Sequence, residues 1–347
     1  MNPVFHKGYT IFRNGTGPVF VAIHSGPNFE NPNNRDENTD IISGLCWQRM
    51  GGALVVSNLS RKRTMGIDLN RGIPPKRLAI NMWNKFQNES IDESTLHYKR
   101  NYGWVARNLK DYEERLKLYN SFWESLKNLG NMYVFVHRKY ARIKNYPSVM
   151  DFVTFKGKGA KEEMVKEIIE KFNFQHSSFF RKIESDYINT VMLEQSKIYD
   201  RIINFFGSLE ALNNSYKNGM KEDIAKIREH GTESLVRRME KNFTKENYLN
   251  AARSAIRNMG HPKITVENIF TGEMAHGPNN QLVLGKDRVV IEIECNQFIN
   301  YWYPEFASDI INNFLHEVKK TMETIGPVQL DIYNTIKRKT FLENIRE

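Results

Sequence analysis

The sequence predicts an α/β protein with a mostly parallel or mixed central sheet flanked by helices, interrupted by a large helical insertion. Three observations predict this class. Short, continuously apolar runs alternate with turns and helical segments through residue 155. A helix-rich segment then extends from about 161 to 259, and no proline occurs between Pro147 and Pro262. A strand pattern returns at 288–294. Continuously apolar strands separated by helices are typical of a parallel sheet covered on both faces.

Four apolar runs in the first part of the chain are predicted strands. The run 18–23 ends at His24-Ser25-Gly26, and the run 131–136 ends at His137. The other two are 52–57 and 151–155. Between them, residues 111–129 carry apolar side chains at spacings of three and four residues, which indicates an amphipathic helix. A further helix is predicted at 305–325.

The segment 161–259 is rich in Glu, Lys, Ile, Leu and Met, and it is predicted to form several amphipathic helices. Breaks are expected near Phe172-Asn173, Gly207-Ser208, 213–219 and 231–232, and Thr244 is a predicted N-cap. We therefore divide the chain into residues 1–158 and 263–347 as two parts of one core, and 159–262 as a helical insertion. The insertion is hypothesised to cover a cleft and set substrate size; an oligomerisation or partner-binding surface is an alternative.

Composition favours an ordinary globular protein. Hydrophobic residues make up 40% and charged residues 26%, which argues against extensive disorder. No apolar stretch is long enough for a membrane helix, and the N-terminus lacks the apolar segment of a secretory signal. The only cysteines are Cys46 and Cys295, and two free thiols in a reducing compartment fit better than a disulfide. The cytoplasm is the expected location.

The formal net charge of +10 allows an anionic partner, including nucleic acid. Lys and Arg lie beside Asp and Glu along the helical segments, which is typical of solvated helix faces. The densest basic run, Arg61-Lys62-Arg63, is short. For Lys62 and Arg63 surface salt bridges are the favoured interpretation. A carboxylate-bearing small molecule is therefore preferred over nucleic acid as the partner, and no membrane contact is expected.

His24 and His137 each follow a predicted strand, and ligands bind at the carboxyl edge of open α/β sheets. Imidazole is a common zinc ligand, and a catalytic zinc has three protein ligands. A single histidine here is more often a buried structural residue, but two in equivalent places favour a metal site. The loop after His24 offers carboxylates as third ligand. Asp40, at a predicted helix N-cap, is preferred; the others are Glu30, Asp36 and Glu37.

Glu292 and Glu294 are predicted to project from one face of an otherwise apolar strand. A carboxylate facing a core is costly unless it is paired or bound to a metal. Beside a metal-bound water, such a group is suited to act as general base. The alternative is an edge strand with one solvated face.

Ser60-Arg61 and Asp68-Leu69-Asn70-Arg71 are further candidates. Arginine matches a carboxylate through two parallel hydrogen bonds, and Asn adds an amide donor. The alternative is salt bridging at the surface. Two arginines near the His24 strand would suit an anionic small substrate.

In this order, the segments resemble the N-formylglutamate amidohydrolase family, which is related in fold to zinc carboxypeptidases. The resemblance covers about 18–157 and 280–303. It rests on these elements: His24-Ser25-Gly26, Thr39-Asp40, Ser60-Arg61, Ile67-Asp68-Leu69-Asn70-Arg71, His137, Asp151-Phe-Val and Ile293-Glu294-Cys295-Asn296.

The resemblance implies a zinc-dependent amidohydrolase acting on an N-acyl amino acid or short peptide. His24, Asp40 and His137 would hold the zinc, and Glu294 would be the general base or acid. Arg61 would polarise the scissile carbonyl, while the segment with Asp68, Asn70 and Arg71 would bind the substrate carboxylate. Arg138 stands where the family usually has serine, which leaves the acyl group open. A carboxypeptidase or deacylase on the same scaffold and a non-enzymatic basic binding protein are the competing hypotheses.

Overall fold

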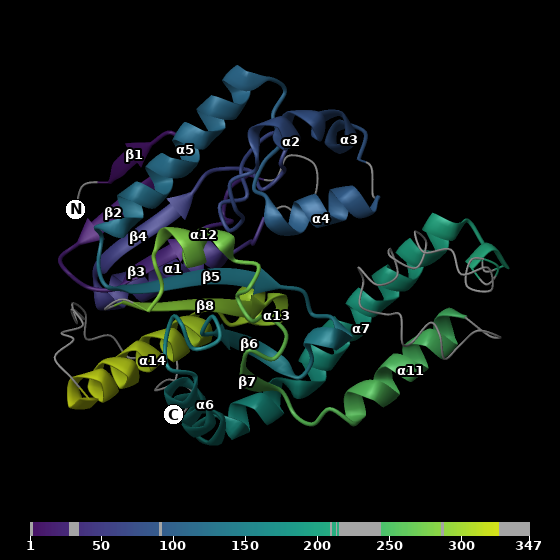
Figure 1. Ribbon diagram of the computed structural model, residues 1–347. Coiled ribbons are helices and arrows are strands. Elements are labelled where there is room, and N and C mark those ends of the chain that lie inside the picture. The colour runs from purple at the N-terminus through teal and green to yellow at the C-terminus, as the bar shows by residue number, and fades with distance from the viewer. Residues whose placement is uncertain are drawn as a thin grey trace.

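The computed structural model describes residues 3–27, 35–89, 92–208, 210–212, 214, 244–285 and 288–325. Within these residues eight strands form one mixed sheet with helices on both faces, so the predicted α/β class is confirmed (Figure 1).

The predicted strands occur close to their expected bounds. The strands are β1 (Val4–His6), β2 (Tyr9–Asn14), β3 (Val19–Ala22), β4 (Gly52–Ser57), β5 (Met132–Lys139), β6 (Ser148–Val153), β7 (Lys263–Val266) and β8 (Val289–Asn296). The helices are α1 (Thr39–Met50), α2 (Lys76–Asn81), α3 (Trp83–Gln87), α4 (Glu93–Asn101), α5 (Leu109–Lys127), η2 (Ile143–Asn145), α6 (Glu162–Gln175), α7 (Ser177–Phe206), α11 (Lys245–Arg257), α12 (His276–Gln281), α13 (Gln297–Trp302) and α14 (Pro304–Ile325).

The strand order is β1-β2-β4-β3-β5-β8-β6-β7. The four central strands β4, β3, β5 and β8 are mutually parallel. Strand β2 pairs antiparallel with β4, and β6 pairs antiparallel with β8. Since β8 lies between β5 and β6, the edge-strand alternative for Glu292 and Glu294 is wrong.

The two faces of the sheet are covered by different helices. Helices α1, α14 and α6 contribute to the apolar core on one face, and α5 packs with α12 on the other (Figure 1). The chain leaves β3 through α1 to reach β4, and later returns through α5 to β5 on the other side of β3. The connection after β3 leads to a strand on one side of it, and the connection that ends in β5 leads to the other side. Such a change of direction between neighbouring strands is a switch point, and it opens a crevice at the carboxyl edge of the sheet.

Helices α6, α7 and α11 form the described part of the predicted insertion. Their buried side chains share one apolar cluster with the sheet. The break expected at Phe172-Asn173 lies instead at His176, because Phe172 is buried and the Asn173 amide pairs with both backbone groups of Ile264 in β7 at 2.8 Å. Helix α7 ends at Gly207, where φ is 74°, as predicted.

Other predicted helix signals have different outcomes. The Thr244 hydroxyl accepts a hydrogen bond from Asn247 N, which confirms this N-cap. The break at 231–232 and most of 213–219 lie outside the described residues.

Cys46 and Cys295 are buried and form no disulfide.

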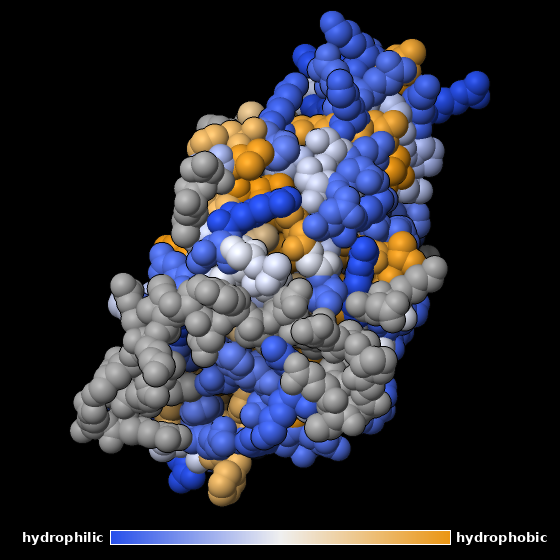
Figure 2. Space-filling view, turned by 90° about the vertical axis from the view of Figure 1, so that its left-hand side faces the viewer, coloured by the Kyte–Doolittle hydropathy of each residue, from blue (hydrophilic) through white to orange (hydrophobic). Residues whose placement is uncertain are grey.

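On the face seen in Figure 2, hydrophobic and hydrophilic residues of the described part of the chain alternate over the surface. Among the described residues no helix combines the length and the apolar character needed to span a membrane.

Candidate functional site

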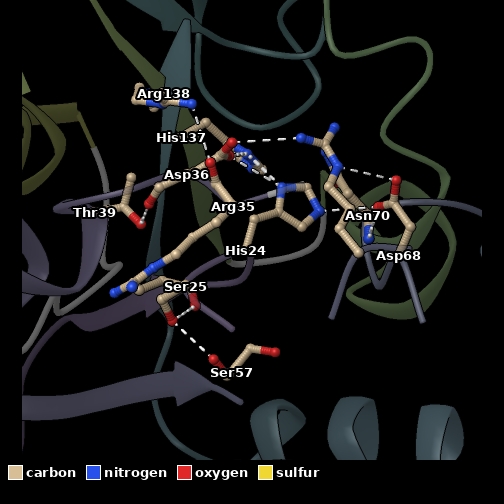
Figure 3. Close-up of polar contacts among 12 residues, drawn as sticks. His24, Ser25, Arg35, Asp36, Thr39, Ser57, Asp68, Asn70, His137 and Arg138 are labelled. Carbon is tan, nitrogen blue, oxygen red and sulfur yellow. Dashed lines mark hydrogen bonds and ion pairs between the residues drawn. The ribbon is translucent and has the colours of Figure 1, made fainter. Parts of the chain in front are cut away.

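The switch point brings the two predicted histidines together. His24 lies two residues beyond β3, and His137 lies within β5, which continues to Lys139. Their Nδ1 atoms are 3.2 Å apart, and both side chains are buried (Figure 3). The two strands are adjacent and parallel, so residues near their carboxyl ends meet at one place.

Asp36 completes this cluster. Its Oδ2 lies 3.2 Å from Nδ1 of His24 and 3.1 Å from Nδ1 of His137 (Figure 3). The preferred third ligand, Asp40, is not brought to the histidines. It lies in the first turn of α1 after the N-cap Asn38, and its carboxylate is 3.7 Å from Arg35 Nη2 at the surface. Glu30 lies outside the described residues.

The backbone explains why Asp36 points inward. Its N–H donates to the carbonyl of His24 at 2.9 Å, and its own carbonyl accepts from the Thr39 hydroxyl at 2.7 Å. Asn38 adopts a positive φ of 61° next to α1. The loop therefore turns sharply between residue 36, which faces the crevice, and residue 40, which lies on the helix.

The geometry of these three donor atoms fits a metal ion. The three separations among Nδ1 of His24, Nδ1 of His137 and Oδ2 of Asp36 are 3.1 to 3.2 Å. Ligands of a tetrahedral ion with bonds of about 2.0–2.1 Å are separated by about 3.3–3.4 Å. The three side chains are buried, and together they could hold a metal ion.

Asp68 sets the tautomer of His24. Its Oδ1 lies 2.9 Å from Nε2 of His24, so a neutral imidazole carries its proton on Nε2 and directs the Nδ1 lone pair at the cluster (Figure 3). Asp68 was predicted to contact substrate. It does not line the cavity beside the cluster, and its side chain is 1% exposed because His24, Arg61 and Arg63 surround it. A carboxylate behind a ligating histidine orients the ring toward a metal.

Two arginines hold these acids. Arg61 donates from Nε to Asp68 at 3.2 Å and from Nη1 to Asp36 at 3.4 Å. Burial lowers the pKa of Arg61, but the negative charges of Asp68 and then Asp36 outweigh burial and raise this pKa. Arg63 was interpreted as a surface salt-bridging residue, and this is wrong. Its guanidinium is largely buried and donates to the backbone carbonyls of Tyr102 and Lys99 as well as to Asp68.

Glu292 and Glu294 share one face of β8 next to His137, as the alternation predicted. Glu294 is the register partner of His137, and Glu292 Oε2 lies 3.9 Å from His137 Nε2. Both carboxylates are buried. Burial raises the pKa of Glu294 to about 8; His137 opposes this and Glu292 adds to it. Burial lowers the pKa of His137, but the negative charges of Glu292 and then Asp36 raise it to about 9. The cluster therefore favours a positive charge, which a proton or a metal ion can supply.

A cavity of about 410 Å³ opens beside the cluster. Asn70 and Arg71 line it together with His137 and Glu294, so the structure joins the predicted substrate-binding pair to the predicted metal site. Asn70 Oδ1 and Arg71 Nε are buried polar atoms without a hydrogen-bond partner among the described residues. Cationic side chains outnumber carboxylates in the cavity wall, which favours an anionic ligand. The cations are Arg61, Arg71, Arg138, Lys139, Arg142 and Lys144, and the carboxylates are Asp36, Glu273, Glu292 and Glu294.

Local sequence features explain how the segments are held. The Ser25 hydroxyl lies 2.9 Å from the carbonyls of both Ala22 and Ser57, which ties β3 to β4. At Gly26 an added Cβ would lie 2.0 Å from the carbonyl oxygen of Leu59, so only glycine allows this approach. The histidine-serine-glycine motif thus positions His24 through backbone packing.

Two polar residues of the site region were not assigned a role from the sequence. Asp151 is buried and accepts from Thr265 Oγ1 at 2.6 Å and from Asn268 N at 3.1 Å, which holds the loop that forms one wall of the cavity. Lys139 is buried, lines the cavity and lies 2.5 Å from Ser148 Oγ. Both residues lie on apolar strands. A charged residue inside an apolar run was the sequence feature that could have identified them as residues of the site region.

Comparison of the chain with protein-family models, curated proteins and solved structures gave no significant match. The functional argument therefore rests on the residues and their geometry.

Asp68→Asn tests whether Asp68 orients His24. We expect the affinity for zinc to fall about 10- to 100-fold, because the neutral amide of asparagine replaces the charged acceptor that holds the His24 ring in place. Competition with a chromogenic chelator measures this affinity. Asp200→Asn, at an exposed acid paired with Lys245, is the control and should retain wild-type affinity. Unchanged zinc affinity combined with a raised KM would return Asp68 to a substrate-binding role.

Proposed function

We propose that this chain is a zinc-dependent hydrolase that cleaves the amide bond of an N-acyl amino acid or short peptide bearing a free carboxylate. The observation that carries the proposal is the convergence of His24, Asp36 and His137 beside a cavity. Asp36 and His137 line this cavity together with Glu294 and Arg71. Two imidazoles and one carboxylate are a common ligand set of catalytic zinc. Zinc bound there would polarise a carbonyl oxygen and lower the pKa of a water molecule.

The remaining residues have distinct roles in this proposal. Glu294 accepts the proton of the attacking water and returns it to the leaving amine; a carboxyl pKa near neutrality suits both transfers. Arg61 lies in the cavity wall beside Asp36, where its fixed positive charge would stabilise negative charge developing on the carbonyl oxygen.

Substrate recognition is assigned to Asn70 and Arg71. Arg71 Nη1 donates to the carbonyl of Met274, which fixes the guanidinium and leaves Nε directed to a buried position without a partner among the described residues. Asn70 is held by its carbonyl, which accepts from Gly277 N at 3.2 Å. A substrate carboxylate in the cavity would pair with the positive charge of Arg71, which lines its wall, and the Asn70 amide would bind the adjoining polar group.

Membership of the N-formylglutamate amidohydrolase family and a zinc carboxypeptidase-like sheet are parts of the same proposal. The four parallel central strands, with His24, His137 and Glu294 at their carboxyl ends, are consistent with it. The replacement of Asp40 by Asp36 as third ligand does not alter the ligand chemistry.

Metal content and substrate dependence test the proposal together. Purified protein should bind about one zinc per chain, and His24→Ala should lose it. N-acyl amino acids should be hydrolysed, whereas the same compounds with the carboxylate converted to an amide should not. Arg71→Met should raise KM for the free acids about 10- to 100-fold, as expected for the loss of a charged hydrogen bond.

The control is Arg77→Met, at an exposed residue of α2, which should behave as wild type. If the protein holds no divalent metal, or if His24→Ala binds zinc as well as the parent does, the proposal fails.

A further inference from the structure

A second hollow of about 250 Å³ adjoins the cavity beside His24, Asp36 and His137, and we name it the distal pocket. Arg138 and Tyr140, at the end of β5 and just after it, line both hollows. Helices α7 and α13 supply the other walls of the distal pocket. Part of the predicted helical insertion therefore lies next to the proposed active site.

Most charges in the distal pocket are satisfied within the protein. Arg138 Nη1 lies 3.4 Å from Glu37 Oε2, and the Tyr301 hydroxyl also donates to Glu37. Lys197 Nζ lies 2.7 Å from Glu194 Oε1. Because these charges neutralise one another, electrostatic attraction is not the main property of this pocket.

Two aromatic side chains in the wall of the distal pocket are exposed. Trp302 is 72% exposed and Tyr301 is 47% exposed, and both line the pocket at the end of α13. The guanidinium Cζ atoms of Arg138 and Arg142 lie over the Tyr140 ring, 4.9 and 4.6 Å from its centre. An exposed tryptophan in a hollow beside a site is a typical anchor for a planar or apolar ligand group.

The direction of the substrate follows from the proposed function, on which this inference rests. Figure 3 shows Asn70 and Arg138 on opposite sides of the group formed by His24, Asp36 and His137. If Asn70 and Arg71 bind the carboxylate of the leaving amino acid, the acyl portion extends toward Arg138 and Tyr140. A formyl or acetyl group is too short to pass beyond them.

We propose that the distal pocket is a subsite for the acyl side of the substrate, and that it binds an aromatic residue of a short peptide whose C-terminal residue is released. The aromatic ring packs against Trp302 and Tyr301, while the peptide backbone crosses the carboxyl edge of β5 next to Tyr140. The substrate class is thus a peptide with a free C-terminal carboxylate, rather than an N-formyl amino acid.

A matched substrate series tests this subsite. The series is N-formylglutamate, N-acetylglutamate, N-acetyl-alanyl-glycyl-glutamate and N-acetyl-phenylalanyl-glycyl-glutamate, which share the released residue. The zinc-loaded protein should hydrolyse the phenylalanyl peptide with a kcat/KM about tenfold above that of the alanyl peptide. Trp302→Ala should remove this preference and leave the rates on the two short substrates unchanged.

The control variant is Phe174→Ala, which removes an exposed aromatic side chain of α6 that does not line the distal pocket. It should retain the wild-type preference. A second measurement is independent of hydrolysis: binding of the product N-acetyl-phenylalanyl-glycine to the metal-free protein, followed by isothermal titration calorimetry. Trp302→Ala should weaken this binding about tenfold.

The outcomes separate the two proposals. Hydrolysis of all four substrates without aromatic preference, and with no effect of Trp302→Ala, would overturn the subsite and leave the hydrolase intact. Hydrolysis of none, with product binding that depends on Trp302, would overturn the proposed function and support the subsite. Neither hydrolysis nor product binding would overturn both.

Discussion

Asp36→Asn is expected to reduce zinc affinity by more than about 100-fold. Changing a residue that only hydrogen-bonds to a metal ligand costs about 10- to 100-fold, and this change replaces a proposed anionic ligand with a neutral amide. Asparagine keeps the shape of the side chain but removes the negative charge that lies 3.1 Å and 3.2 Å from the two imidazoles. Equilibrium competition with a chelator measures the affinity. Activity on any substrate should fall in parallel when zinc is limiting.

Asp40→Asn is the matched control for this change. It alters the same residue type four positions away, but its side chain is 31% exposed and pairs with Arg35. We expect wild-type zinc affinity. The reverse pattern, with zinc lost in Asp40→Asn and retained in Asp36→Asn, would show that the ligand expected from the sequence is the correct one and that Asp36 has only a structural role.

Glu294→Gln is expected to lower kcat/KM about 10²- to 10⁴-fold, the range associated with a general base. Glutamine occupies the same volume on β8 and cannot accept the proton of an attacking water. Zinc content should be unchanged if His24, Asp36 and His137 hold the ion. Glu294 also forms, with His137 and Glu292, a second buried group that could hold a metal ion, so loss of zinc in this variant would assign the ligands to that group. Steady-state kinetics combined with metal analysis of the same preparation distinguishes loss of chemistry from loss of metal.

Glu292→Gln provides the comparison on the same strand face. Glu292 approaches the far nitrogen of His137 at 3.9 Å, so its neutralisation should weaken zinc binding more than it lowers the rate at saturating zinc. The opposite result is that Glu292→Gln abolishes turnover with zinc retained, while Glu294→Gln has little effect. It would make Glu292, and not Glu294, the general base.

The local pattern of the sequence was sufficient for the central elements. Continuous apolar runs predicted β3, β4, β5 and β6, and strict alternation predicted which face of β8 carries Glu292 and Glu294. These signals depend on neighbours within a few residues, so they survive without knowledge of the fold. Strands β1, β2 and β7 were not predicted; β1 and β7 are only three and four residues long, too short for a clear period.

The sequence also indicated most residues of the candidate site. His24, His137 and Glu294 follow or end apolar strands, and the placement of Arg61, Asn70 and Arg71 next to them agrees with the prediction that these residues act together. That prediction needed only the rule that parallel strands bring their carboxyl ends to one edge.

Only the tertiary structure decided which carboxylates face the cluster. Asp36 and Asp40 differ by four positions, and the sharp backbone turn at Asn38 directs one inward and the other to the surface. Asp68 lies behind His24 rather than in the cavity because Arg61 and Arg63 pair with it, and Arg63 is itself held by the backbone carbonyls of Tyr102 and Lys99. Side-chain direction in a loop depends on contacts made across the fold, and no periodicity encodes it. The sequence by itself therefore determined the central strands and the chemistry available at the edge of the sheet, while the packing of loops determined which side chains form the candidate ligand set.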